Sequence, residues 1–281
     1  MHSHRIPPTR GKYIMKLGCC GSFDKAAEIK AAGFTFLELN VQGVLKGEMP
    51  SEEWDKTRPD PATFVLPTPA ANGLVPATLP IVGPDRDMTK LQDYMQRVAK
   101  RAQLLGLQSL VFGSGGARRC PPDIGLSKAM DQIAEFTSMA GDVCSHHGVT
   151  IVIEHLNQKE TNTLNKLSQE RELIQRVNHP NVRALVDSYH YGLEKETDLA
   201  LLGLEGLLAH VHVAEPIDRI QPGAHEPGSG KAFDFVHFFR LLRRIGYDGL
   251  ISFEGKWSAP IAEAGPKCVA YMQECWDKAG R

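Results

Sequence analysis

The feature that most constrains this chain is an alternation of short apolar runs with longer amphipathic stretches, repeated eight times along 281 residues. Most of the runs are continuously apolar, which is typical of strands in a parallel sheet whose outer face is covered. The pattern therefore predicts strands at 13–20, 35–41, 64–71, 109–115, 150–156, 182–190, 208–215 and 249–255.

The stretches between these runs carry a helical period. In 87–105, apolar residues recur at spacings of three and four and form one stripe, and Gly106 follows as a stop. Comparable stretches lie at 22–32, 127–147, 165–178, 194–203, 233–245 and 261–278. Residues 43–61 are rich in Gly, Pro and charge, so there we expect mostly loop with a short helix.

Eight β-α repeats indicate an α/β fold, a (β/α)8 TIM barrel in a single domain over residues 13–281. The alternative is an open doubly wound sheet. No G-x-G-x-x-G follows the first predicted strand, which weakens a dinucleotide-binding version of that sheet. Residues 1–12 lack the apolar segment of a signal peptide, and we expect them to form a flexible tail.

Composition argues against several partners. The net charge is -1, and no run approaches the 18 apolar residues of a membrane span, so we expect neither a nucleic-acid nor a membrane partner. The six cysteines form no C-x-x-C pair, and we interpret them as free thiols in a cytoplasmic protein. A homodimer or homotetramer is compatible with such a chain.

Polar side chains gather where the predicted strands end. In a barrel these ends converge on one face, so we expect Glu154, Asp187, His212 and Glu254 to meet despite their separation in sequence. Clustered carboxylates repel one another unless a cation is present. Three carboxylates and one imidazole suit one divalent ion, with Mn²⁺ expected first and Co²⁺, Mg²⁺ or Zn²⁺ as alternatives.

Each of these residues has a simpler interpretation. A single glutamate at a strand end is as readily explained by an ion pair with lysine or arginine, and a histidine in a strand by a hydrogen-bonded core position. His210 lies two residues deeper than His212, and we assign it that core position; His155 should face away from the metal. The coincidence of four strand-end ligands favours the metal hypothesis.

Five motifs resemble those of the sugar-phosphate isomerase/epimerase superfamily of xylose isomerase-like barrels: EHLNQKE (154–160), DSYH (187–190), HVHVAE (210–215), PGSG (227–230) and GYDGLISFE (246–254). The resemblance covers residues 13–278 and is strongest to ketose 3-epimerases of the tagatose/psicose type. It implies the four-residue metal site, with Glu154 and Glu254 also acting as acid and base. It further implies that Glu160 and His190 contact sugar hydroxyls.

Three further residues were candidates for substrate binding. Arg219 belongs to a run EPIDR that is one residue longer than the E-x-N-R run of the epimerases. Glu38 ends the second predicted strand, and Arg118 follows the glycine-rich end of the fourth, where an arginine can hold a carboxylate or phosphate. The loop before PGSG brings His225 near the mouth without a family role.

The predicted chemistry is proton transfer next to a ketone of a sugar or sugar derivative. One glutamate removes the proton to give a cis-enediolate, and the other returns a proton on the opposite face, which inverts the carbon. Return to the neighbouring carbon would give aldose–ketose isomerisation instead, and the residues do not choose between these outcomes.

Three other activities share this kind of barrel or site. A related lyase such as inosose dehydratase would use the same metal but expel a hydroxyl. An endonuclease IV-like enzyme needs extra histidines after the third and fourth strands, which end TPAAN and FGSGG here. A non-catalytic sugar-binding barrel would not need both glutamates.

Overall fold

Eight parallel strands close into one barrel within residues 15–280, the part of the chain that the computed structural model describes. The strands follow one another in chain order, and β8 pairs with β1 to complete the ring. They are β1 (Lys16–Cys20), β2 (Phe36–Asn40), β3 (Ala70–Asn72), β4 (Ser109–Phe112), β5 (Thr150–Glu154), β6 (Val182–Asp187), β7 (Leu208–Val213) and β8 (Leu250–Phe253). The predicted (β/α)8 barrel is confirmed, whereas the predicted tail at 1–12 lies outside the described residues.

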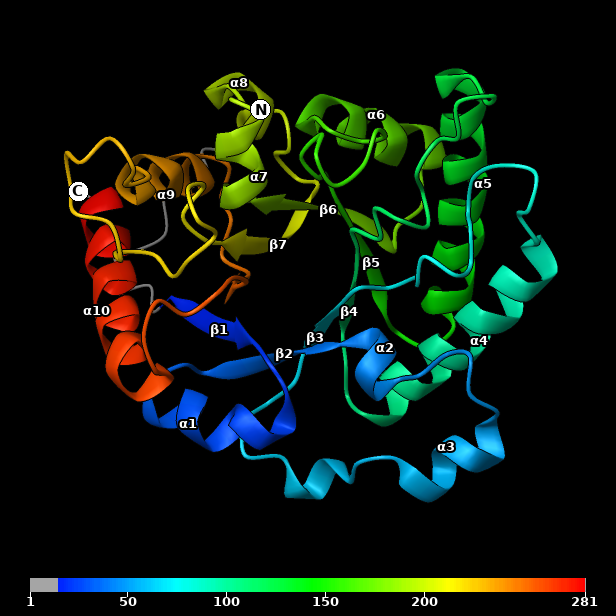
Figure 1. The fold of residues 1–281 in the computed structure, drawn as a ribbon, viewed down its shortest axis with the longest axis horizontal. Helices are drawn as coiled ribbons and strands as arrows, with labels where there is room; N and C mark the ends of the chain where they lie inside the picture. Colours follow the sequence, from blue (N-terminus) through cyan, green and yellow to red (C-terminus); the bar gives the residue numbers. More distant parts are fainter. Residues whose placement is uncertain (1–14, 281) are drawn as a thin grey trace, which may run out of the picture.

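Helices surround the strands, as Figure 1 shows. They are α1 (Ala26–Ala31), α2 (Val41–Val44), α3 (Ser51–Thr57), α4 (Met88–Leu104), α5 (Leu126–Ser145), α6 (Leu167–Val177), α7 (Ser188–Leu193), α8 (Asp198–Leu202), α9 (Phe235–Arg244) and α10 (Ile261–Ala279), with short 3₁₀ turns at Phe23–Lys25 and Pro61–Thr63. The long predicted helices are confirmed. The short helix expected within 43–61 is α3, and the one expected at 194–203 is reduced to α8.

The alternation of side chains along each strand separates the core from the barrel interior. On β5, Ile151 and Ile153 pack in the large core shared with the helices, whereas Val152 joins a small cluster with Val111 and Leu185. Glu154 lies two residues beyond Val152, so its side chain leaves the strand on the same face as that inner cluster. The same parity applies to Leu185 and Asp187 on β6.

The predicted strands are longer than the observed ones, and at two of them the sequence explains the difference. The prediction of a strand at 64–71 is wrong for most of its length, because Pro67 and Pro69 have no N–H to give to a sheet. Their carbonyls still accept the N–H groups of Leu37 (2.9 Å) and Gln108 (2.7 Å), so the segment approaches the sheet before β3 begins. The strand predicted to reach residue 190 ends at Asp187, whose side chain caps α7.

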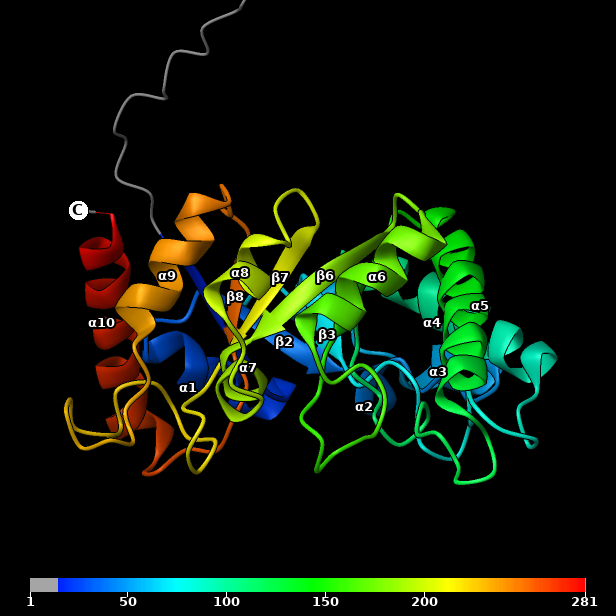
Figure 2. The same cartoon turned by 90° about the horizontal axis from the view of Figure 1, so that it is seen from above.

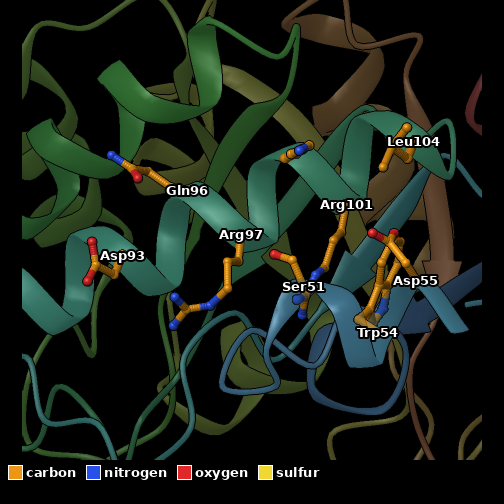
Figure 3. A pocket seen from close by; sticks show the side chains of 9 residues that line it. Ser51, Trp54, Asp55, Asp93, Gln96, Arg97, Arg101 and Leu104 are labelled. Carbon is orange, nitrogen blue, oxygen red and sulfur yellow. The ribbon is translucent and has the colours of Figure 1, made fainter. Parts of the chain in front are cut away.

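A hollow between α3 and α4 is lined by Trp54 and Arg101, and Figure 3 shows Arg101 extending from α4 toward Trp54. The guanidinium lies 4.9 Å from the centre of the Trp54 ring, and its nitrogens donate to the carbonyls of Leu45 (2.7 Å), Lys46 (2.6 Å) and Met49 (2.7 Å). These polar groups therefore hold the loop after α2 in place.

Trp54 is the anchor of this region, and its loss should destabilise the protein. The side chain is 2% exposed, and its Nε1–H donates to the carbonyl of Val44 at 2.9 Å. Trp54→Ala is expected to lower the free energy of unfolding by about 3–5 kcal/mol, measured by urea denaturation. Trp54→Phe keeps a ring and should cost less. Equal stability of Trp54→Ala and the wild type would refute the anchoring role.

Candidate active site and metal centre

Four strands deliver one side chain each to a common point at the carboxyl end of the barrel. Glu154 and Asp187 are the last residues of β5 and β6, His212 lies near the end of β7, and Glu254 directly follows β8. One donor atom of each residue lies within 4.8 Å of the others. Figure 2 shows α2 and α7, which follow the ends of β2 and β6, on this side of the barrel.

His212 is at the centre of this group. Its Nδ1 lies 3.3 Å from Glu154 Oε1 and 3.3 Å from Glu254 Oε2. Asp187 Oδ1 accepts the N–H of Tyr189 at 2.9 Å, whereas Asp187 Oδ2 is buried and has no hydrogen-bond partner within residues 15–280. A buried oxygen without a donor is costly unless another ligand satisfies it.

Burial and neighbouring charges shift the pKa values of the carboxylates in the site. Burial raises the pKa of Asp187 to about 7; Arg219 opposes the shift and the charge of Glu154 adds to it. Burial likewise raises the pKa of Glu154. Burial also disfavours the charge of Glu254, but His212 and Arg219 outweigh it and hold the pKa at about 2. The ionised forms of Asp187 and Glu154 are therefore disfavoured, and a bound cation would stabilise them.

Glu38 occupies the layer beneath His212. Its Oε1 lies 2.9 Å from His212 Nε2, and its Oε2 lies 2.7 Å from His210 Nε2. Both oxygens are engaged by imidazoles and the side chain is fully buried, so Glu38 supports the histidines here and the predicted contact with substrate stays a prediction. A carboxylate that accepts from Nε2 of a histidine leaves Nδ1 free to bind a metal. His210 takes the hydrogen-bonded core position expected of it.

Arg118 makes its contacts inside the protein. The side chain is fully buried, and its Nη2 donates to the carbonyl of Glu154 at 2.9 Å while Nη1 lies 3.5 Å from the carbonyl of Phe112. The guanidinium turns inward and joins the ends of β4 and β5, and the predicted substrate contact of Arg118 stays a prediction. The guanidinium thereby fixes the backbone from which the Glu154 side chain projects.

Arg219 reaches the site from the loop after β7. Its Nη2 lies 2.7 Å from Glu254 Oε2, its Nη1 lies 3.4 Å from Glu160 Oε1, and the guanidinium lies 4.5 Å from the ring centre of Tyr189. The loop turns through two successive left-handed residues, Asp218 (φ 69°) and Arg219 (φ 49°). Arg219 and Glu160 are thus brought together above the metal-site residues.

Two asparagines complete the site and were not predicted. Asn72, the last residue of β3, donates through Nδ2 to Glu254 Oε1 at 2.7 Å. Asn157 contacts both His190 and Glu160. The available signal for Asn72 was the strand end TPAAN, where an amide follows small apolar residues, and Asn157 stands inside the motif EHLNQKE.

Gly113 leaves room for the Glu154 carboxylate. A Cβ atom at this position would lie 2.4 Å from Glu154 Oε2, closer than any real contact allows. His155, as expected, turns to the other side of β5, where its Nδ1 lies 3.6 Å from Glu170 Oε2. His225 contacts its own loop, through the carbonyl of Ile217 (3.3 Å) and the carboxylate of Asp218 (3.6 Å).

The chain belongs to the xylose isomerase-like TIM barrel family, whose description matches residues 26–275. Over 156 residues it is 30% identical to a ketose 3-epimerase from Arthrobacter globiformis, an alignment that covers 54% of this chain and 49% of that protein. Over 203 residues it is 28% identical to an L-ribulose 3-epimerase from Methylomonas sp. strain DH-1, with 66% and 67% covered. The chain thus spans about half to two thirds of these relatives.

A solved structure shares the fold over nearly the whole chain. The apo crystal structure of 3-keto-D-glucoside 4-epimerase YcjR from E. coli aligns with a TM-score of 0.75 at 23% identity, covering 93% of this chain and 100% of that one. Among residues 15–280, none of the helices combines the length and the apolar character that a bilayer crossing requires.

Proposed function

We propose that this protein is a divalent-metal-dependent epimerase of ketoses or related keto sugars. The observation that carries the proposal is the convergence of Glu154, Asp187, His212 and Glu254, with both glutamates 3.3 Å from one imidazole nitrogen. Ketose 3-epimerase and L-ribulose 3-epimerase are the names of two relatives, which supports a keto sugar as the substrate class.

The donor set fits a metal ion. Three carboxylates and one imidazole form an oxygen-rich group suited to Mn²⁺, Co²⁺ or Mg²⁺, and Zn²⁺ is an alternative. Asp187 Oδ2 is buried without a hydrogen-bond partner in the described part of the chain, so it is available as a ligand. Glu38 holds Nε2 of His212 and directs Nδ1 to the same point. These four residues would hold the ion.

The two glutamates would move the proton. A divalent ion, when bound, stabilises negative charge on the oxygen of a ketone whose neighbouring carbon is losing a proton. One of Glu154 and Glu254 takes that proton, and the other delivers a proton to the opposite face of the resulting enediolate, which inverts the carbon. Arg219 and Glu160 lie above the pair and would bind the hydroxyls of the sugar.

The direct test is hydrogen exchange with solvent. The protein loaded with Mn²⁺ is incubated in D₂O with D-fructose, D-tagatose and L-ribulose, and deuterium uptake is followed by NMR. We expect deuterium uptake at C3, the stereocentre next to the C2 ketone, together with the C3 epimer of the reactive sugar. Deuterium at C1 with an aldose product would indicate isomerisation, and loss of water would indicate a dehydratase. No uptake with any of these or related ketoses, and no metal bound by elemental analysis, would refute the proposal.

A further inference from the structure

His190 is held by Asn157 in a way that defines where its proton lies. The Nδ1 atom of His190 lies 3.1 Å from the backbone N–H of Asn157 and 2.9 Å from the side-chain Nδ2 of the same residue. A ring nitrogen that faces two N–H donors must present its lone pair. The imidazole therefore carries its proton on Nε2.

The orientation of the Asn157 amide is set by two further contacts. Its Oδ1 accepts the N–H of Lys159 at 3.0 Å, and its Nδ2 also donates to Glu160 Oε1 at 2.9 Å. An ionised carboxylate only accepts hydrogen bonds. If the amide were flipped, Oδ1 would face an acceptor at Glu160 and another at His190, and Nδ2 would face the N–H of Lys159. The Nδ2 group therefore faces both residues.

The opposite nitrogen of His190 faces the site. Its Nε2 lies 3.6 Å from Asp187 Oδ2 and 4.0 Å from Glu154 Oε1, both beyond hydrogen-bond distance. It is buried and has no hydrogen-bond partner among the residues that the structure describes. A donor fixed in this state beside the metal-site carboxylates is available to an oxygen atom of a bound ligand.

We propose that Asn157 is a positioning residue that fixes His190 as an Nε2–H donor and Glu160 as an acceptor. The pair offers one donor and one acceptor to oxygen atoms of a polyhydroxylated ligand. The nature of that ligand rests on the proposed function, whereas the proton position does not. Asn157 is 2% exposed and lies behind both side chains, so it acts through them.

The test replaces the donor with an acceptor of the same shape. In Asn157→Asp a carboxylate oxygen competes with the remaining backbone N–H (3.1 Å) for His190 Nδ1, and a charge-assisted hydrogen bond from Nδ1–H to that oxygen is stronger than the neutral one from the backbone. In metal-free protein labelled with ¹⁵N-histidine, two-bond ¹H–¹⁵N spectra should show Nε2–H for wild-type His190 and a protonated Nδ1 in Asn157→Asp. The His190→Gln variant, which lacks these signals, assigns them.

Asn165→Asp is the matched control. Asn165 stands in the same loop, and its Nδ2 donates to the carbonyls of Leu156 (2.7 Å) and Thr161 (3.1 Å), so it contributes to the loop without touching His190. His190 should keep its Nε2–H form in this variant. A wild-type His190 protonated on Nδ1, or an unchanged spectrum in Asn157→Asp, would overturn the proposal. The wild-type spectrum alone shows which nitrogen of His190 carries the proton, even if a variant does not fold.

Activity gives a second readout. In the exchange assay with Mn²⁺ and the reactive ketose, Asn157→Asp should lower kcat at least about tenfold, because a neutral His190 protonated on Nδ1 has no Nε2–H left to donate to substrate. Asn165→Asp loses two hydrogen bonds of the loop but leaves His190 untouched, so it should lower kcat less than Asn157→Asp does. If the wild type exchanges with no ketose, the proposed function fails while the proton position of His190 still stands or falls by NMR.

Discussion

Replacing either Glu154 or Glu254 with glutamine is expected to abolish proton exchange between a keto sugar and solvent. Each change removes a group that can take or deliver a proton, an effect worth about 10²–10⁴-fold in kcat, and it also removes one negative charge from the proposed metal ligands. Glutamine preserves the shape of both side chains, so the barrel should remain folded. Deuterium uptake measured by NMR in D₂O checks the result.

The control for both variants is Glu205→Gln, a change of the same chemistry on an exposed glutamate after α8. It should retain wild-type exchange. Full activity in both Glu154→Gln and Glu254→Gln would show that other groups move the proton. Retained metal binding together with lost exchange would assign the glutamates mainly to proton transfer.

Replacing Glu38 with glutamine is expected to weaken metal binding about 10–100-fold, the usual effect of removing a partner of a metal-binding histidine. Glu38 accepts from Nε2 of His212 with one oxygen and lies 2.7 Å from Nε2 of His210 with the other. Glutamine has only one acceptor oxygen, so one imidazole loses its partner, and the lost charge makes His212 a poorer ligand. Isothermal titration with Mn²⁺ measures the change in Kd.

Glu205→Gln again serves as the control and should bind Mn²⁺ like the wild type. Thermal unfolding of Glu38→Gln without metal shows whether the buried amide disturbs the fold. An unchanged Kd in a folded Glu38→Gln protein would mean that His212 is oriented without Glu38, and the proposed metal centre would then need another support.

The barrel and the meeting of the four strand-end residues could be predicted from two regularities of the sequence: the period of its apolar pattern, and the alternation of side chains between the two faces of a strand. Continuous apolar runs require a sheet covered by helices, and a residue two positions after an inner residue shares its face. Glu154 follows Val152 by two positions, and Asp187 follows Leu185 by two positions, so both carboxylates share the inner face. Convergence at one end of the barrel is then a property of the fold.

Residues outside this rule were harder to predict. Glu38 obeys the parity of β2 but lies one layer deeper, where His210 and His212 engage both of its oxygens. Arg118 lies in a loop, where the direction of a side chain is independent of strand parity, and it turned inward to backbone carbonyls. The contact between Arg219 and Glu254 could not be predicted from the length of the EPIDR run.

The asparagines of the site show a different limit. Amides carry no charge, and Asn72 and Asn157 stand where a turn or a strand end would explain them equally well. Their contribution lies in which atom faces which neighbour, for example Asn72 Nδ2 against Glu254 Oε1. Only coordinates contain that information, since the same letters are compatible with either orientation.

The loop that carries Arg219 has a consequence for engineering. The four proposed metal ligands are positioned by strands, whereas the backbone of Arg219 is held by contacts between two loops. Its carbonyl accepts the N–H of Lys256 at 2.7 Å, and the next residue, Ile220, pairs with Lys256. Loops tolerate insertion better than strands do. A library that keeps Arg219 and varies the length and residues of 216–218 therefore samples new ligand shapes while the strand-borne residues below the loop stay unchanged.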